Sequence, residues 1–298
     1  MWGFRSLKDV QIRPGKFNVL IGPNNAGKSN LFDSFRFLHD VACLGSVEEA
    51  LKRRGSWDRV LYYDSEQMGF RLQVCLKDHV FDYELRLVQE HIERECLKID
   101  DRVVAEWSGS KIRFFYEDGS FKSFSPSRTT SIFHYVSSAS EEQPPFHMVA
   151  FFKKFLEIMR FYSIITEAIR GRSELRRTWE LQRNGGNLAA VLHTVYLSDR
   201  RRFLRIERIL RDFVEDIDEL RIGFDREPGF KERAVVWIEV LERWFDRSFD
   251  AGQVSDGVLK LLAYITAVEL AEGPVFFEEP ENYVHPYLAE ALIRLLRQ

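Results

Sequence analysis

The order of apolar and polar residues divides the chain into segments of different period. Residues 57–135 alternate apolar and polar side chains, as in FRLQVCL and FDYELRLVQ, and this period of two is typical of half-buried antiparallel strands. Residues 146–219 instead repeat apolar side chains at intervals of three and four, as in FFKKFLEIMRFYSIITEAIR and RRFLRIERILRDFVEDI, which predicts helices. We expect Gln67, Gln73 and Gln89 to be solvated strand residues rather than metal ligands.

Short apolar runs and helices are predicted on either side of these two regions. Residues 1–21 indicate two strands around a turn at residues 13–16, and the second, FNVLIG, reads as a buried strand. A helix follows through LFDSFRFL, and VEEALKRRGS predicts another that stops at Gly55. Residues 220–245 return to alternating strands around Pro228-Gly229, and LKLLAYITAVELA predicts a helix before the short strand of residues 275–277. Together these elements predict an α/β fold.

Composition sets limits on this interpretation. The chain has 298 residues, enough for one large or two modest domains, and its 25 phenylalanines predict a phenylalanine-rich core. The net charge of −3 gives no overall basic surface for nucleic acid but is compatible with a local one. Three cysteines without a C-x-x-C pair argue against a disulfide framework or zinc site. Since neither a signal peptide nor a membrane span of about 20 apolar residues is present, we expect a cytoplasmic protein without a membrane partner.

A glycine-rich loop follows the apolar run of residues 17–21. The spacing Gly22-x-x-x-x-Gly27-Lys28-Ser29, between an apolar run and a helical pattern, matches the P-loop. Asparagine tolerates a left-handed backbone better than other non-glycine residues, so the two asparagines are compatible with a tight turn. The predicted binding residues are Gly22, Pro23, Asn24, Asn25, Ala26, Gly27, Lys28, Ser29 and Asn30.

The residue types of this loop suit a nucleoside triphosphate. Successive backbone N–H groups form a concavity for anions, and the following helix adds the positive end of its dipole. Lys28 can place its charge on the β- and γ-phosphates, while the Ser29 hydroxyl can ligate Mg²⁺. We therefore predict that the loop binds ATP together with Mg²⁺.

Two adjacent carboxylates, Glu278 and Glu279, follow the apolar run of residues 275–277. Ligands gather at the carboxyl ends of parallel strands in an open α/β sheet. Adjacent strand residues point to opposite faces, so the pair indicates two roles: one carboxylate holds Mg²⁺ through water and the other polarises the attacking water. Alone this pair is weak evidence, because acidic residues commonly end strands in solvent.

The third motif, Ser255-Asp256-Gly257, opens a predicted helix, which Ser255 or Asp256 can cap without any further role. The P-loop, this helix start and the acidic strand end occur in an order that resembles the ABC-type ATPases of the SMC, RecF and OLD proteins. The compact OLD-like ATPases of predicted AAA type are more similar still. The resemblance covers nearly the whole chain and implies an α/β P-loop ABC-type ATPase head with an antiparallel β subdomain and an inserted helical subdomain. We divide it into an N-terminal ATPase lobe (1–135), a helical insertion (136–219) and a C-terminal ATPase lobe (220–298).

The resemblance also implies roles for particular residues. Residues 22–29 correspond to the Walker A loop, Glu278 to the metal-binding Walker B acid, and Glu279 to the catalytic glutamate, with Lys28 as a second catalytic residue. Ser255, Asp256 and Gly257 correspond to the signature, which in such ATPases closes on the γ-phosphate held by a partner subunit. ATP would then join two heads into a homodimer or a higher even oligomer. Residues 281–286 correspond to the D-loop.

The chain departs from its relatives near the C-terminal end of the sequence. Relatives continue past the helix after His285-Pro286 into a strand ending in a switch histidine, whereas this sequence stops at Gln298. No other histidine occupies an equivalent place. We expect a fragment of a longer protein rather than a short form with impaired hydrolysis. OLD-type relatives carry a nuclease domain after the ATPase and others use a separate effector, so an effector nuclease or toxin subunit is an expected partner.

Two functions remain open from the sequence. One is an ATP-hydrolysing enzyme that dimerises on ATP and serves DNA maintenance or anti-phage defence. The other is a nucleotide-gated scaffold with slow or no hydrolysis that regulates a nuclease or toxin. The second motif set disfavours a small-molecule kinase. The arginine-rich helices offer a surface for nucleic acid, but a solvated or ion-paired face explains them equally well: Arg170, Arg172, Arg176, Arg177, Arg183, Arg200, Arg201, Arg202 and Arg205.

Overall fold

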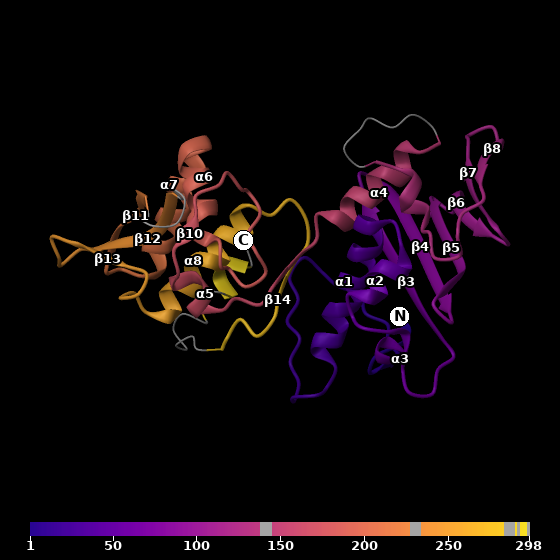
Figure 1. Cartoon of the computed structure of the whole chain (residues 1–298), viewed down its shortest axis with the longest axis horizontal. Helices are drawn as coiled ribbons and strands as arrows, with labels where there is room; N and C mark the ends of the chain where they lie inside the picture. Colours follow the sequence, from indigo (N-terminus) through magenta and orange to yellow (C-terminus); the bar gives the residue numbers. More distant parts are fainter. Residues whose placement is uncertain (138–144, 227–233, 283–289, 291–292, 297–298) are drawn as a thin grey trace. The chain divides into compact units, whose positions relative to one another are not determined.

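A computed structural model of the chain describes residues 1–137, 145–226, 234–282, 290 and 293–296. The chain forms two compact units, Met1–Met159 and Arg160–Gln298, each of which we describe by itself (Figure 1). The boundary lies inside the predicted helical segment of residues 136–219. The first helix of that segment therefore belongs to the first unit and the others to the second.

An antiparallel sheet of eight strands forms the first unit, in the order β2-β1-β3-β4-β5-β6-β7-β8. The predicted β region is confirmed, and the turn at residues 117–120 joins β7 to β8, with Tyr116 N–H donating to Ser120 O at 2.8 Å. Gln67, Gln73 and Gln89 are exposed, as expected, although Gln89 lies in a hairpin turn rather than in a strand. The strands are β1 (Trp2–Phe4), β2 (Leu7–Asp9), β3 (Gln67–Leu76), β4 (His79–Val88), β5 (His91–Ile99), β6 (Arg102–Ser108), β7 (Lys111–Phe115) and β8 (Phe121–Phe124).

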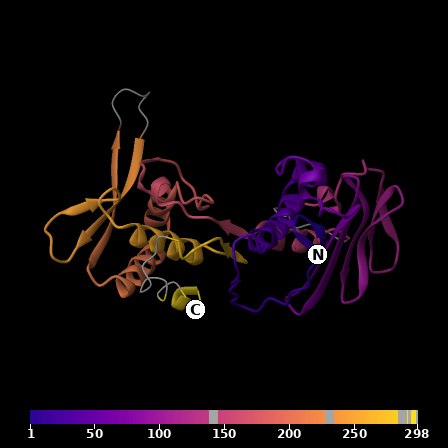
Figure 2. The ribbon, with the colours of Figure 1, turned by 90° about the horizontal axis from the view of Figure 1, so that it is seen from below.

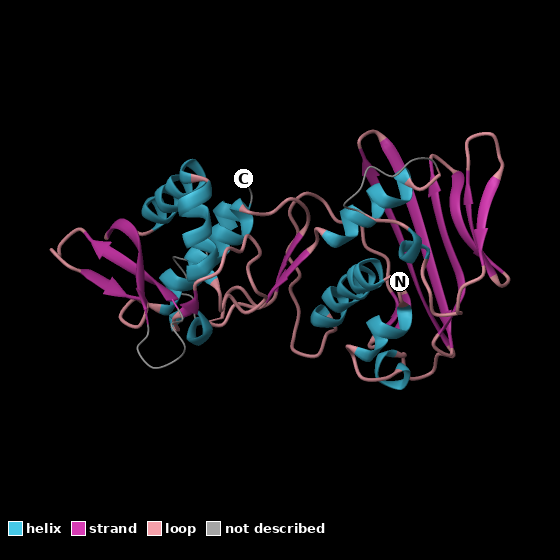
Figure 3. Cartoon of the chain, turned by 45° about the horizontal axis from the view of Figure 1, so that its top comes forward, coloured by secondary structure: helices cyan, strands magenta, loops and turns pink. Residues whose placement is uncertain are grey.

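Helices cover one face of this sheet (Figure 3). They are α1 (Lys28–Leu44), α2 (Val47–Lys52), α3 (Trp57–Val60), the 3₁₀ helix η1 (Ile132–Tyr135) and α4 (His147–Glu157). Alternate residues of β4 are buried on this face, where the ring of Phe81 stacks on that of Phe152 in α4, with centroids 5.6 Å apart. The predicted phenylalanine core is confirmed, since Phe37 and Phe70 are likewise buried and stack at 5.1 Å.

The buried strand predicted at residues 17–22 does not form. Among the described residues, this segment belongs to no strand, and Val19, Leu20 and Ile21 are 60%, 41% and 92% exposed. A strand needs a neighbour that completes its backbone hydrogen bonds, and among the described residues no strand pairs with residues 17–22. Residues 2–9 instead fold back as the β1–β2 hairpin, in which Arg5 has a φ of 49°.

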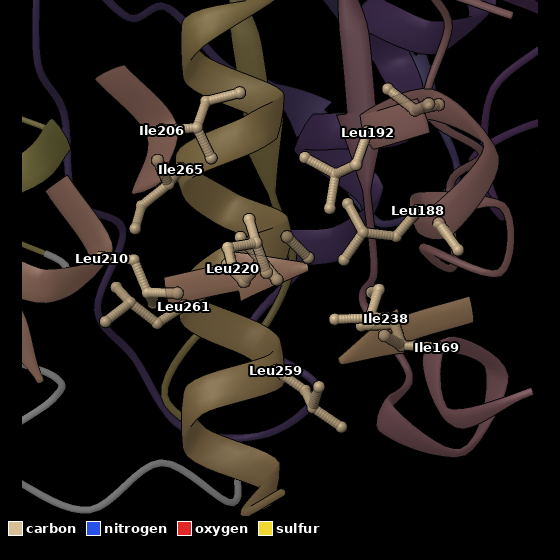
Figure 4. Packing of buried hydrophobic residues seen from close by; sticks show 14 of the residues in the cluster. Ile169, Leu188, Leu192, Ile206, Leu210, Leu220, Ile238, Leu259, Leu261 and Ile265 are labelled. Carbon is tan, nitrogen blue, oxygen red and sulfur yellow. The ribbon is translucent and has the colours of Figure 1, made fainter. Parts of the chain in front are cut away.

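The second unit surrounds helix α8 (Asp256–Glu269), whose residues from Gly257 to Ala267 are all buried. Figure 4 shows leucine and isoleucine side chains packed around this helix. A four-stranded sheet also packs into this core, and its strands β11 and β12 form the long two-stranded ribbon in Figure 2. The elements are α5 (Thr166–Arg170), β10 (Ser173–Glu174), α6 (Leu188–Ser198), α7 (Arg200–Phe213), β11 (Ile217–Arg226), β12 (Ala234–Glu242) and β13 (Ser248–Asp250). The predicted Pro228-Gly229 turn lies outside the described residues.

The helix predicted over FFKKFLEIMRFYSIITEAIR is interrupted by a strand. Helix α4 ends at Glu157, and β9 (Arg160–Tyr162) pairs in parallel with β14 (Val275–Phe277). The ring of Phe161 stacks on that of Phe276 with centroids 4.7 Å apart. Pairing with a distant strand thus overrides the local helical period. The predicted strand at residues 275–277 is confirmed, although it is half-buried rather than fully buried.

Candidate nucleotide-binding loop and acidic strand end

The glycine-rich loop ends where α1 begins. Gly27 is the N-cap of α1 and has a φ of 91°, while Asn25 has a φ of 65°. Both angles lie in the left-handed region, which glycine adopts readily and asparagine tolerates. A Cβ on Gly27 would lie 2.8 Å from Ser6 Oγ, which can turn away, so the left-handed backbone is the main reason for glycine there.

Lys28 lies against the backbone of its own loop. Its Nζ donates to the carbonyl oxygens of Gly22 at 2.6 Å and Pro23 at 3.0 Å. Among the described residues no side chain caps α1, so the N–H groups of its first turn are available to an anion. Residues 22–26 and Ser29 are exposed. The loop therefore combines a fixed positive charge, a helix N-terminus and open access, which fits a phosphate group.

Ion pairs anchor α1 behind the loop. Asp33 binds Arg5 at 2.8 Å and Arg54 at 3.0 Å, and the buried Asp40 binds Arg54 at 2.8 Å. Burial raises the pKa of Asp40, but hydrogen bonds from His39 and Arg54 outweigh it and lower that pKa to about 2. Asp40 is therefore charged at neutral pH and holds the C-terminal half of α1, while Asp33 holds the second turn of the helix.

The two carboxylates after β14 have different partners. Glu278 N–H donates to Tyr162 O at 2.8 Å, and Glu278 Oε2 accepts from Arg183 Nη2 at 2.6 Å. Glu279 Oε2 instead accepts from Asn282 Nδ2 at 2.7 Å. Different partners are consistent with the two separate roles predicted for this pair, which remain predictions.

The backbone of Glu279 has an uncommon conformation. Its φ is 47°, and Pro280 follows it, although a residue before proline usually adopts an extended backbone. Most other non-glycine residues with positive φ occur in pairs at the β-hairpin turns, at residues 77–78, 89–90 and 100–101. Such conformations cost on the order of 1–3 kcal/mol and cluster at functional sites. Glu279 is therefore a candidate functional residue on structural grounds too.

The serine at the start of α8 forms the predicted N-cap. Ser255 Oγ accepts from Val258 N–H at 3.4 Å, and Asp256 Oδ1 accepts from Arg170 Nη2 at 2.5 Å. Arg170 also donates to Gly252 O at 3.0 Å. The capping interpretation of Ser255 is thus confirmed, and its additional role in the signature remains a prediction. Gly257 is buried in the first turn of α8.

Sequence reasoning missed two basic residues near the acidic strand end. Arg183 was indistinguishable from the other arginines, because its partner Glu278 lies 95 residues away. Lys260 is 3% exposed in α8, donates to Asn282 O, and has a pKa lowered by burial. The sequence does single out Lys260, because a lysine inside the apolar run VLKLLAYI is unusual.

The predicted residues fall into two groups. The loop of residues 22–30 belongs to the first unit, whereas residues 255–257 and 278–279 belong to the second. Within the described residues, no cluster of three or more His, Cys, Asp or Glu could hold a metal ion. The same residues include no helix with the length and apolar character that crossing a bilayer requires. Of the D-loop-like segment, residues 283–286 lie outside the described residues.

Comparison with known proteins decides the family. The model of one family, described as "AAA domain, putative AbiEii toxin, Type IV TA system", matches residues 17–298. The chain belongs to this AAA family. Members are nucleotide-binding ATPase domains, so the predicted ATPase class is confirmed. A comparison with curated protein sequences gave no match.

A solved structure supports the fold of this AAA domain. The SMC head in "Crystal structure of the SmcHead bound to the C-winged helix domain of ScpA" is 13% identical, with a TM-score of 0.54. The match covers 99% of this chain and 83% of that chain. The predicted fold class, an α/β P-loop ATPase head of the ABC/SMC type with an antiparallel β region, is thereby confirmed.

Proposed function

We propose that this AAA domain binds ATP with Mg²⁺ in the loop of residues 22–30 and hydrolyses it. The observation that carries the proposal is the glycine-only turn at Gly27, with the Lys28 ammonium held over the loop and α1 uncapped behind it. Donors fixed in advance where negative charge develops need no reorganisation during the reaction. In this scheme Lys28 stabilises the phosphates, and the loop residues from Asn24 to Asn30 supply the backbone N–H donors, since Pro23 has none.

The proposed metal ligands offer oxygen atoms only. Mg²⁺ prefers oxygen, usually keeps several waters, and takes one or two protein ligands with the substrate phosphates. The Ser29 hydroxyl and the Glu278 carboxylate match this preference. When bound, Mg²⁺ would neutralise charge on the phosphates. Glu279 is the proposed general base, which takes a proton from the attacking water.

The role of Glu279 can be tested by removing its charge. Glu279→Gln should lower the ATPase rate by about 10² to 10⁴, because a positioned general base contributes roughly that factor, while ATP binding persists. Glu272→Gln, an exposed carboxylate just before β14, is the matched control and should keep the parent rate. Hydrolysis at the parent rate in Glu279→Gln would assign the catalytic role to another residue.

We further propose that ATP joins two copies of the chain, with Ser255, Asp256 and Gly257 of one copy closing on the nucleotide of the other. The exposed position of Ser255 at the N-terminus of α8 supports this, because helix N-termini bind anions. The SMC head was solved with a domain of another protein, which supports an effector partner for this chain. The family description gives the matched domain itself as a putative toxin of a Type IV TA system, which favours a defence role; the effector nuclease or toxin rests on the resemblance of the sequence alone.

A nucleic-acid partner is supported by one face of α7. Arg201 and Arg208 are exposed, lie seven residues apart and, among the described residues, form no ion pair. Other arginines of the helical region are engaged: Arg170 binds Asp256, and Arg205 binds Glu269 at 2.7 Å. A shallow hollow of about 700 Å³ lies on this face, lined by Asp199, Arg201, Arg202, Leu204, Arg205 and Arg208. We propose that this face contacts nucleic-acid phosphates during DNA maintenance or defence.

A further inference from the structure

We infer that Arg183 is a positioning residue that orients the Glu278 carboxylate for a divalent cation. The inference rests on the proposed function. The guanidinium binds a single oxygen, Oε2, at 2.6 Å. Within the part of the chain that the structure describes, Oε1 has no hydrogen-bond partner, so it is free to face a metal-bound water. The Arg183 and Glu278 side chains are 47% and 23% exposed, which leaves the pair open to solvent.

The backbone of residues 162–165 binds the backbone on both sides of this ion pair. Glu278 N–H donates to Tyr162 O, the last residue of β9. The next residue, Ser163, donates its N–H to Arg183 O at 2.9 Å, and Ile165 N–H donates to Asn184 O at 3.0 Å. Successive residues of one extended segment therefore position the carboxylate and the guanidinium. Main-chain hydrogen bonds therefore fix the separation of the two backbones, and the side chains of Glu278 and Arg183 meet from these fixed positions.

The loop that carries Arg183 is braced from inside. Asn187 is 6% exposed; its Oδ1 accepts from Gln182 N–H at 2.8 Å, and its Nδ2 donates to Glu180 O at 2.9 Å. Gly185 has a φ of 80°, and a Cβ there would lie 3.1 Å from Ile169 Cγ1. A buried amide and a required glycine thus brace the turn after Arg183.

This arrangement matches the outer partner of a metal-ligating carboxylate. Such partners fix the orientation of the ligand, and their loss typically weakens metal affinity by about 10- to 100-fold. A guanidinium suits this task because its planar donors define a direction, whereas an ammonium acts as a point charge. Arg183 acts through Glu278 and need not touch the nucleotide.

The test measures how strongly Mg²⁺ tightens the binding of a fluorescent, non-hydrolysable ATP analogue to the full chain. By linkage, this factor also reports how strongly the nucleotide tightens Mg²⁺ binding. Arg183→Ala should reduce the factor by about 10- to 100-fold and leave the Mg²⁺-free affinity unchanged, and Arg183→Lys should restore part of it. Arg221→Ala is the matched control, because Arg221 binds Glu219 at the same 2.6 Å with a similar exposure of 45%. In this variant Mg²⁺ should tighten analogue binding by the same factor as in the parent.

A second substitution separates orientation from a direct role. In a Glu278→Gln background, Arg183→Ala should have little further effect, since residues acting through one another are non-additive. Three results would overturn the inference. In the first, Mg²⁺ tightens analogue binding in Arg183→Ala as much as in the parent. In the second, Arg183→Ala lowers this tightening in the Glu278→Gln background as much as in the parent; in the third, it weakens binding without Mg²⁺ as much as binding with Mg²⁺. Failure of the proposed function would give a different result: the parent chain itself would not bind the ATP analogue.

Discussion

Glu95 is a fully buried carboxyl group in the middle of the eight-stranded sheet. Three donors reach it: Tyr83 Oη at 2.7 Å, Ser131 Oγ at 2.6 Å and Ile132 N–H at 2.9 Å. Burial raises the pKa of Glu95 to about 7, against the opposing effect of these hydrogen bonds. The residue joins β5 to η1 and contributes to the stability of the first unit.

Stability should consequently depend on pH through Glu95. A carboxyl whose pKa is raised on folding contributes stability that is fully present below the unfolded pKa of 4.5 and is lost as pH rises through about 7. This change amounts to about 3 kcal/mol. Urea unfolding at pH 5 and pH 8 should show a smaller pH-dependent loss in Glu95→Gln than in the parent. Glu93→Gln, a half-exposed carboxylate on the same strand, should keep the full loss, and an equal loss in all three proteins would contradict this account.

For single residues, the sequence predicted the conformation of the loop at Gly27 but not the ion pair of Arg183 with Glu278. Glycine at position 27 follows from the motif, and the structure gives the physical reason for it, the left-handed φ of 91°. The pairing of Arg183 with Glu278 could not be predicted, because charge alone does not distinguish one arginine from its neighbours and the contact spans 95 residues.

Among the elements, α7 presents a testable surface. Arg201 and Arg208 are two turns apart, about 10 Å along the helix axis. Each DNA phosphate that a protein neutralises contributes roughly −0.9 to the slope of log K for DNA binding against log salt concentration. Replacing both with alanine should weaken binding to duplex DNA and reduce the magnitude of this slope by about 1.8. The measurement is fluorescence anisotropy over a salt series.

The control for α7 removes the same charge elsewhere in the second unit. Arg176 and Arg177 are exposed and precede α6, so their double alanine variant should retain the parent affinity and slope. DNA binding that is absent in the parent, or unchanged by the α7 substitutions, would remove nucleic acid from the proposed partners of this face.

The elements also show where sequence patterns stop being sufficient. The strands of residues 67–124 were predictable because each hairpin pairs neighbours in sequence and buries alternate side chains. Residues 17–22 and 160–162 were not, since a short apolar run becomes a strand only where a partner is present. The first run has none among the described residues, and the second pairs with β14 from more than 100 residues away.

For the whole molecule, the proposal predicts association that depends on ATP. Ser255→Arg places a bulky cation at the N-terminus of α8, where it opposes the helix dipole and blocks approach of a second copy. Light scattering should show a larger particle for the parent with ATP and Mg²⁺ than without, and no such increase for Ser255→Arg. Ser198→Arg, at the exposed end of α6, should associate as the parent does.

Equal particle size with and without ATP in the parent would contradict the dimer. Retained association in Ser255→Arg would move the contact away from α8. Either outcome leaves nucleotide binding by the loop intact, because the loop of residues 22–30 and the proposed metal ligand Glu278 belong to the same copy of the chain.

The central claim is that residues 22–30 bind ATP, and calorimetric titration of the full chain with ATP and Mg²⁺ tests it most directly. The parent should bind, and Lys28→Ala should bind about 10- to 100-fold more weakly, because a charged hydrogen bond contributes roughly 1.5–3 kcal/mol. Lys16→Ala, an exposed lysine ahead of the loop, should bind like the parent. Equal affinity in the parent and Lys28→Ala would contradict the assignment of the loop.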